Sequence, residues 1–211
     1  MSNGNRATRR IISIPDDLKP KILASAFFNR PTLEVAQSLL GKYLLRRLDG
    51  KTQALRLTEV EAYDGFEDKA SHAHRGKTAR NQVMFGPAGT WYVYLVYGMH
   101  WMLNIVTGPK NYPSAVLIRG VEGVSGPGRL TKFLGIERTF NGKKASRSSE
   151  LWMEDRGEKV LHFHILTTPR IGVEYAGPIW SQKPYWFVLN PQCAQCPNRD
   201  KSFITSKRTA W

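Results

Sequence analysis

The sequence predicts a single α+β domain, in which a curved antiparallel β-sheet carries surrounding helices and one protruding β-hairpin. Its strand-like segments are rich in aromatic and β-branched residues and follow one another with only a few helical segments between them. The alternation of strands and helices with phosphate-binding glycines, typical of nucleotide-binding domains, is missing. With 211 residues, 41% of them hydrophobic, the chain is large enough for one domain with a substantial core.

The charge of the chain is strongly positive. The formal net charge is +14 and the sequence pI is about 10.0. We expect a mobile basic arm at residues 1–20, a domain at residues 21–190 and a polar basic tail at residues 191–211. The two ends supply +5 of the charge, so +9 remains on the body. A folded surface of this charge attracts a polyanion, and nucleic acid is the first candidate.

The first elements are a helix and a hairpin. The helix is expected after Pro31 and before Gly41, because four apolar residues fall on one helical stripe: Val35, Ala36, Leu39 and Leu40. Two strands follow at residues 42–47 and 53–62, and Asp49-Gly50 provides the turn between them. On the second strand, the period of two places four residues on one face: Leu55, Leu57, Glu59 and Glu61.

A second hairpin is predicted from residues 90–96 and 100–106, which are almost wholly apolar, aromatic or β-branched. Gly98 supplies the positive φ of a tight turn, so Tyr97 and Met99 flank an outward-facing tip. The amide of Asn104 lies among apolar neighbours and needs partners or a ligand. The hairpin could be core alone, but an aromatic ring at the tip of a basic protein suggests a wedge that enters a base stack.

The remaining elements are less regular. Residues 65–89 form a loop rich in His, Arg and Gly, with a short helix expected at 79–85. A strand at 115–120 carries Arg119 near its end, and Gly126-Pro127-Gly128 opens a helix at 129–134. Residues 137–157 are charged and rich in turns, and strands are expected at 160–167 and 185–189. On the first of these, His162 and His164 indicate a solvated face rather than metal ligands.

The carboxylates of the second strand are candidates for chemistry. Glu61 ends the strand beside Glu59 on the same face, so desolvation and like-charge repulsion could raise its pKa. Such a group suits general-base work on water. The alternative is a pair of surface glutamates. Asp68 lies on a charged, surface-like run and is interpreted as structural. His72 and His74, taken alone, are loop histidines.

The two cysteines, Cys193 and Cys196, form one C-x-x-C motif between Pro191 and Pro197. A zinc site needs two further ligands at suitable spacing, and no second pair exists. We interpret the pair as spare thiols or a local disulfide, and we expect no metal. No apolar run reaches transmembrane length, and the N-terminus lacks the apolar region of a signal peptide, so we expect an intracellular protein without a membrane partner.

A series of motifs in order and register resembles the alkyladenine (methylpurine) DNA glycosylase family. The resemblance covers about residues 25–190. The central motifs are Glu61-Ala62-Tyr63, the spacing to His72, Arg80-Asn81, Met84-Phe85, Gly89-Thr90, Val93-Tyr94, Tyr97-Gly98-Met99, Asn104 and Arg119. The flanking motifs are Phe27-Phe28, Leu39-Leu40-Gly41, Gly126-Pro127-Gly128-Arg129-Leu130, Arg170-Ile171-Gly172-Val173 and Lys183-Pro184.

The resemblance implies an enzyme that flips alkylated or deaminated purines out of duplex DNA and hydrolyses the N-glycosidic bond, which starts base excision repair. Glu61 matches the general base, and Arg119 matches the residue that helps to place the water. Since water is the nucleophile, the enzyme is expected to be monofunctional, without lyase activity and without a cofactor. A monomer is expected, located in the cytoplasm (nucleoid) of a bacterium or in the nucleus of a eukaryote.

The same resemblance assigns the pocket and the wedge. Tyr63, His72 and Tyr94 match the rings that stack on the flipped base, and Asn104 matches the amide that disfavours guanine. At the tip, Tyr97 matches the residue inserted into the vacated space, with Met99 beside it. The chain departs from the family pattern at His100-Trp101, and the far wall of the pocket is left unassigned.

The alternative from another class is a non-catalytic protein that binds lesions or single strands through its basic face and aromatic platform. Such a binder would keep Tyr97 but would have no need of Glu61 and Arg119. Their joint presence favours the enzyme. Within the enzyme, we expect Glu59 to matter much less than Glu61.

Overall fold

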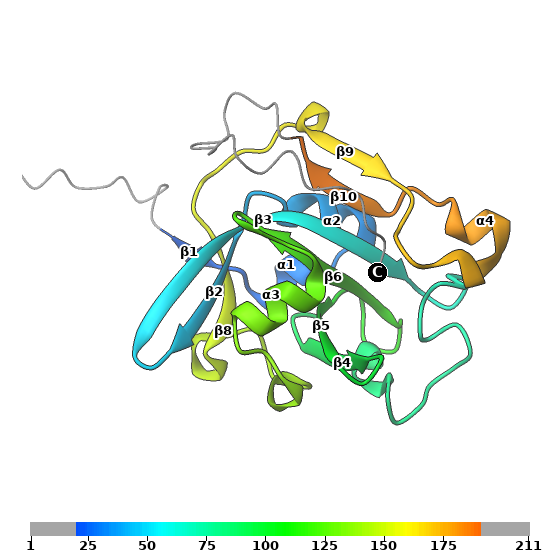
Figure 1. Cartoon of the computed structure of the whole chain (residues 1–211), viewed down its shortest axis with the longest axis horizontal. Coiled ribbons are helices and arrows are strands. Elements are labelled where there is room, and N and C mark those ends of the chain that lie inside the picture. Colours follow the sequence, from blue (N-terminus) through cyan, green and yellow to red (C-terminus); the bar gives the residue numbers. More distant parts are fainter. Residues whose placement is uncertain (1–19, 191–211) are drawn as a thin grey trace, which may run out of the picture.

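The computed structural model describes residues 20–190, and these form the predicted α+β domain (Figure 1). Nearly all of the predicted N-terminal arm, and the whole C-terminal tail with Cys193 and Cys196, lie outside the described residues. The described part contains one ten-stranded antiparallel sheet whose main order is β1-β8-β2-β3-β6-β5-β4. Strand β10 pairs with β3 on one side and with β9 on the other, while β7 pairs with β6.

The helices and strands have the following bounds. The strands are β1 Lys21–Ile22, β2 Tyr43–Leu48, β3 Lys51–Asp64, β4 Trp91–Val96, β5 His100–Val106, β6 Ser114–Val121, β7 Val124–Ser125, β8 Leu151–Asp155, β9 Ile165–Thr168 and β10 Trp186–Leu189. The helices are α1 Ser25–Phe28, α2 Thr32–Leu39, α3 Pro127–Phe133 and α4 Gly177–Ser181. Short 3₁₀ turns connect several of them.

Strand β3 is the element around which the sheet is organised. Its first half pairs with β2, and its second half pairs with β6 and β10. In Figure 1 it runs across the middle of the molecule as the longest strand. From Leu57 to Ala62 it is covered by neighbours, with only Thr58 half-buried. Any polar side chain in this stretch must therefore find partners inside the protein.

The pairing of β3 with β6 is irregular at one place. The register shifts between Leu57 and Glu59 and again between Glu59 and Val60, next to the part of β6 that carries Arg119. Beyond this point the two strands pair regularly from Val60 to Asp64. Irregular pairing of this kind redirects side chains and is frequent beside active sites.

The two predicted hairpins are confirmed. Strands β2 and β3 turn through Asp49-Gly50, and β4 and β5 turn through Tyr97-Gly98; all four turn residues have positive φ. Helix α2 also occupies its predicted place, and Gly41 follows it with a φ of 81°. The main core gathers side chains of α2, α3 and both hairpins, with Trp91 fully buried at the start of β4.

Three predicted segments differ from the structure. Residues 160–167 are not one strand, because His162–His164 form an exposed 3₁₀ turn and β9 begins at Ile165. Residues 137–157 contain a strand, β8, whose acidic end resembled a surface turn. It lies between β1 and β2, where Trp152 Nε1 donates a hydrogen bond to buried Glu154 at 2.8 Å. The helix expected at 79–85 is reduced to a 3₁₀ turn at Gln82–Phe85.

Candidate active site

A narrow pocket walled by aromatic rings lies between β3, β4, β5 and the loop that follows β3. Its volume is about 40 Å³. It brings together all four residues that the sequence assigned to a pocket: Tyr63, His72, Tyr94 and Asn104. The other lining residues are Ala70, Ser71, Met84, Tyr92, Ala115 and Tyr175. A preformed pocket for a drug-sized ligand is typically about 300–1,000 Å³, so this pocket is narrow by comparison.

The rings of the pocket contact one another. The centroids of His72 and Tyr94 lie 4.5 Å apart with an interplanar angle of 70°, and those of Tyr92 and Tyr94 lie 5.0 Å apart. The hydroxyl of Tyr92 and His72 Nδ1 are separated by 3.2 Å. Burial, together with the positive charge of Arg80, lowers the pKa of His72, so its imidazole is neutral at neutral pH.

Asn104 is anchored in the wall by the backbone. Its Nδ2 donates hydrogen bonds to the carbonyl of Tyr92 at 3.0 Å and to that of Met102 at 3.4 Å. The buried amide therefore has the partners that the sequence required. Because both acceptors belong to the β4–β5 hairpin, the position of Asn104 in the pocket is fixed by the hairpin's register.

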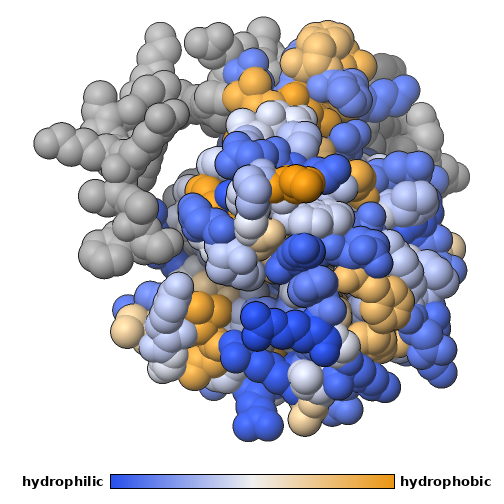
Figure 2. Space-filling model, turned by 90° about the vertical axis from the view of Figure 1, so that its right-hand side faces the viewer, coloured by the Kyte–Doolittle hydropathy of each residue, from blue (hydrophilic) through white to orange (hydrophobic). Residues whose placement is uncertain are grey.

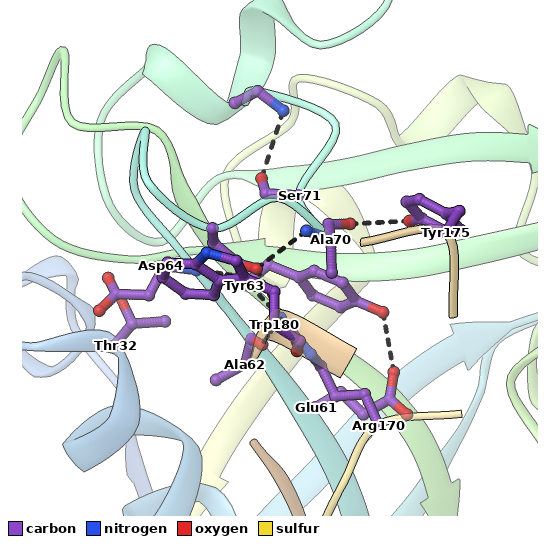
Figure 3. Close-up of polar contacts among 12 residues, drawn as sticks. Thr32, Glu61, Ala62, Tyr63, Asp64, Ala70, Ser71, Arg170, Tyr175 and Trp180 are labelled. Carbon is purple, nitrogen blue, oxygen red and sulfur yellow. Dashed lines mark hydrogen bonds and ion pairs between the residues drawn. The ribbon is translucent and has the colours of Figure 1, made fainter. Parts of the chain in front are cut away.

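Tyr175 forms a wall that the sequence left unassigned. It lies in a 3₁₀ turn, Glu174–Ala176, and its hydroxyl donates a hydrogen bond to the Ala70 carbonyl at 2.9 Å (Figure 3). The residue is still 70% exposed. The sequence signal for this wall was the neighbouring motif Arg170-Ile171-Gly172-Val173. Tyr175 and Ala70 are 105 positions apart, so no local sequence pattern predicts their contact.

Glu61 lies one hydrogen bond behind the pocket lining. It is fully buried, and its Oε2 accepts a hydrogen bond from the Tyr63 hydroxyl at 2.9 Å (Figure 3). Its Oε1 accepts one from the Ile171 N–H at 3.1 Å and lies 3.2 Å from Arg119 Nη1. Surface exposure of this glutamate, the alternative left open by the sequence, is thereby excluded.

Burial raises the pKa of Glu61 above its ordinary value of 4.5. The positive charge of Arg119 and the hydrogen bonds from Ile171 and Tyr63 act in the opposite direction without cancelling the effect. The raised pKa was predicted, but its main cause is desolvation rather than repulsion by Glu59. Arg119 stays charged, because both carboxylates raise its pKa.

Glu59 is buried as well, with 8% of its surface exposed. It accepts a hydrogen bond from Arg119 Nε at 3.0 Å, so one guanidinium contacts both carboxylates. The sequence correctly placed Glu59 and Glu61 on one side of the strand. Its expectation of a minor role for Glu59 did not foresee this shared partner.

The charged run around Asp68 looked like protein surface, but Asp68 itself is fully buried. It forms a bidentate pair with Arg170, with nitrogen–oxygen distances of 2.6 and 2.8 Å, which agrees with the structural role expected of it. Arg170 also donates to the Ala62 carbonyl at 2.8 Å and lies 4.8 Å from the centroid of the Tyr63 ring. This clamp of Asp68 and Arg170 joins the loop after β3 to the segment after β9 and supports Tyr63.

The hairpin tip projects from the body. Tyr97 is 84% exposed and Met99 is 69% exposed, and neither lines the pocket. Tyr97 and Gly98 have φ values of 52° and 69°, and the Met99 N–H bonds the Val96 carbonyl at 3.1 Å. This is the pattern of a type I′ turn, in which a tyrosine is strained.

The surroundings of the site are polar. On the face that carries α4, hydrophilic side chains cover most of the visible surface, interrupted by separate apolar patches (Figure 2). Within residues 20–190, no three His, Cys, Asp or Glu side chains are grouped so as to hold a metal ion. No helix in the same range combines the length and apolar character needed to cross a membrane.

The site thus combines a buried carboxylate of raised pKa, an arginine in contact with it, and a neighbouring pocket of aromatic rings. The model of the family described as "Methylpurine-DNA glycosylase (MPG)" matches residues 26–125 and 122–192. The chain belongs to the methylpurine-DNA glycosylase family.

Relatives from several organisms match most of the chain, and each is named "Putative 3-methyladenine DNA glycosylase". The protein of Methanocella arvoryzae is 47% identical over 176 residues, which cover 74% of this chain and 86% of the relative. That of Anaeromyxobacter dehalogenans strain 2CP-C is 43% identical, with 79% and 83% covered. That of Psychrobacter cryohalolentis is 40% identical, with 77% and 93% covered.

Proposed function

We propose that this glycosylase removes alkylated and deaminated purines, such as 3-methyladenine, 7-methylguanine and hypoxanthine, from duplex DNA. The damaged nucleotide is flipped into the aromatic pocket, and water hydrolyses its N-glycosidic bond. The observation that carries the proposal is the buried carboxylate of Glu61, one hydrogen bond from the pocket and in contact with Arg119. The printed names of the relatives support the class of substrate.

Glu61 acts as the general base. The oxygen of water bonds to C1′, the C1′–N bond breaks, its electron pair leaves with the base, and a proton of the water passes to Glu61. The sugar becomes oxocarbenium-like in the transition state, and a carboxylate beside it stabilises that charge. The raised pKa of Glu61 makes it a better proton acceptor than an ordinary glutamate, while Arg119 keeps a donor next to the water.

The pocket selects the base by stacking and by shape. The rings of Tyr63, His72 and Tyr94 provide faces for a purine, and cationic alkylated purines are attracted to such faces. Asn104 crowds the 2-position and disfavours normal guanine, which lacks the positive charge of 7-methylguanine. Since the pocket is narrow, the walls part as the base enters, and this opening exposes Glu61 to the sugar.

The tip holds the flipped state. Tyr97 enters the space that the base leaves in the stack, and Met99 supports it on the same side. Unstacking requires a few kcal/mol and is easiest for damaged or mismatched pairs, so the step contributes to selection. The strained φ of Tyr97 supports this role, because strain at an exposed turn is retained where the side chain has a task.

The enzyme is monofunctional and works as a monomer. A lyase step needs an amine that forms a Schiff base with the sugar, and none of the residues lining the pocket is a lysine. Cationic 3-methyladenine and 7-methylguanine leave readily, whereas neutral hypoxanthine must be protonated. A non-catalytic binder would place its polar groups at the surface and would gain nothing from a buried carboxylate.

The test is release of free base from duplexes that carry one hypoxanthine, ethenoadenine or 7-methylguanine. We expect free base in the supernatant and an abasic strand that breaks only after alkaline treatment. Binding of these duplexes without base release would favour the non-catalytic alternative. Strand breakage before the alkaline treatment would show a lyase step and contradict the monofunctional assignment.

A further inference from the structure

Glu59 is a buried carboxylate to which the proposed mechanism gives no task. Its Oε1 accepts hydrogen bonds from Arg119 Nε and Trp186 Nε1, both at 3.0 Å, and its Oε2 accepts one from the Ser125 hydroxyl at 3.1 Å. These three donors belong to β6, β10 and β7. Donors from three strands hold the carboxylate in one position, and each strand is itself fixed by its place in the sheet.

The backbone beside Glu59 leaves room for its side chain. Glu59 pairs with Gly120 of β6 at the irregular place in the register. A Cβ at Gly120 would lie 3.0 Å from Glu59 Oε2 and 3.1 Å from Glu59 Cβ. Contacts this short require Glu59 to give way by a few tenths of an ångström, so the absence of a side chain at position 120 helps to accommodate Glu59 in its present position.

Arg119 is held from two sides. Its Nε bonds Glu59, its Nη1 faces Glu61, and its guanidinium carbon lies 5.6 Å from the centroid of the Trp186 ring. We propose that Glu59 is a positioning residue, which fixes the guanidinium of Arg119 so that Nη1 is presented to Glu61 and to the attacking water. This inference rests on the proposed function. It revises the expectation that Glu59 matters little.

Fixing Arg119 is worthwhile because ordering a free arginine side chain costs rotamer entropy. A donor ordered before the substrate arrives needs no reorganisation during the reaction. The position of Arg119 also affects the pKa of Glu61, because its positive charge favours the ionised form of that carboxylate. The groups that face Glu61 are Tyr63 on β3, Tyr94 on β4, Arg119 on β6, and Arg170, Ile171 and Tyr175 after β9.

The experiment compares single-turnover base release by Glu59→Gln and Glu59→Ala across pH. Glu59→Ala should lower the rate by about 10²-fold, the effect of a small misplacement at a reacting centre. Glu59→Gln keeps the shape, so its loss should be smaller. In Glu59→Ala the acid limb, which reports ionisation of Glu61, should move to higher pH, because Arg119 is no longer held where its charge lowers the pKa of Glu61. Glu122→Gln, an exposed glutamate in the β6–β7 turn, is the control.

A rate of Glu59→Ala equal to that of the wild type, or an unmoved acid limb in Glu59→Ala, would overturn the proposal. Gly120→Ala provides a second route, because its methyl group presses on Glu59 without removing the charge. It should slow base release less than Glu59→Ala does, and it should add little in the double variant.

A readout without substrate separates this inference from the proposed function. In the ¹⁵N NMR spectrum of the intact protein, the Arg119 Nε–H signal should be protected from exchange, and Glu59→Ala should abolish the protection. If the wild type releases no base, the proposed function fails, but this signal still decides whether Glu59 holds Arg119. An unchanged signal in Glu59→Ala would refute the positioning role.

Discussion

At the floor of the site, formed by Glu59, Glu61 and Arg119, both carboxylates are buried and the arginine side chain is only 13% exposed. All three have fixed polar partners inside the protein. At the tip, formed by Tyr97, Gly98 and Met99, the two side chains are mostly exposed and the backbone has positive φ at its first two residues. The floor is held by contacts, whereas the tip is held only by the turn that connects β4 and β5.

The comparison shows that the two regions lower the stability of the fold by different mechanisms. At the floor, the carboxylate of Glu61 loses its hydration, and at the tip, the backbone of Tyr97 has a strained conformation. One hairpin links them, since β4 also places Tyr92 and Tyr94 in the pocket. We therefore expect changes at the floor to affect the chemical step and changes at the tip to affect the flipped state.

The largest effect is expected from Glu61→Gln. This change keeps the shape of the side chain but removes the base and its negative charge, so base release should fall by about 10²–10⁴-fold or more. Binding to lesion duplexes should persist or tighten, because the phosphates repel a carboxylate. Single-turnover rates and gel-shift affinities measure the two effects. Glu122→Gln controls for the charge, and near-wild-type release by Glu61→Gln would remove Glu61 from the mechanism.

The same variant should change how stability depends on pH. Below about pH 4.5, the ordinary pKa of a glutamate, Glu61 is protonated in the folded and unfolded protein alike. As the pH rises, the unfolded state ionises first, and stability is lost until the raised folded pKa is passed. Urea denaturation should therefore show Glu61→Gln gaining stability relative to the wild type from pH 4.5 upward. A constant difference between them would contradict the raised pKa.

The clamp behind the floor should matter for folding rather than for chemistry. Asp68→Asn leaves Arg170 as a buried charge without its partner, and this should lower the free energy of unfolding by about 3–5 kcal/mol. Asp155→Asn is the matched control, because Asp155 pairs with Lys42 at a partly exposed site and should lose at most about 1 kcal/mol. If chemical denaturation shows equal losses of unfolding free energy in the two variants, the Asp68–Arg170 pair stabilises the fold no more than the partly exposed Asp155–Lys42 pair.

Tyr97→Ser should weaken the tip while leaving the floor intact. Loss of one stacked ring corresponds to about 1–3 kcal/mol, so affinity for a damaged duplex should fall by about 5-fold to 150-fold. Base release from a lesion in a single strand should suffer less, because little unstacking is needed there. Equal losses on the two substrates would show that Tyr97 does not act by filling the space that the flipped base leaves in the stack.

The smallest effect is expected from Tyr97→Asn. Asparagine tolerates positive φ and favours the type I′ turn before glycine, so stability should rise by up to about 1 kcal/mol while duplex affinity falls. The turn at Asp49-Gly50 has the same signs of φ and offers a control. Asp49→Tyr should lose similar stability without any effect on base release. Thermal denaturation of both variants would reveal whether strain is stored at the tip.

Local sequence patterns determined the hairpins, helix α2 and the motifs that carry the family resemblance. Periodicity and turn residues act over a few positions, so both glycine turns could be predicted from neighbours alone. The pocket residues were predicted only through the family resemblance. The placement of Glu61 next to Arg119 also followed from motifs, and their roles stay proposals. Strand β8 was missed because its acidic end looked like a surface turn.

Only the tertiary structure decided which polar groups are buried and with which partners. Asp68 meets Arg170 across 102 positions, Tyr175 meets Ala70 across 105, and Trp186 meets Glu59 across 127. From sequence alone, a charged residue is predicted to be exposed unless its partner is known, because burial is tolerated only when a partner compensates for the lost hydration. These partners are distant in the sequence, so local patterns do not predict them. The sequence could therefore indicate the candidate site residues but not the contacts that hold them in place.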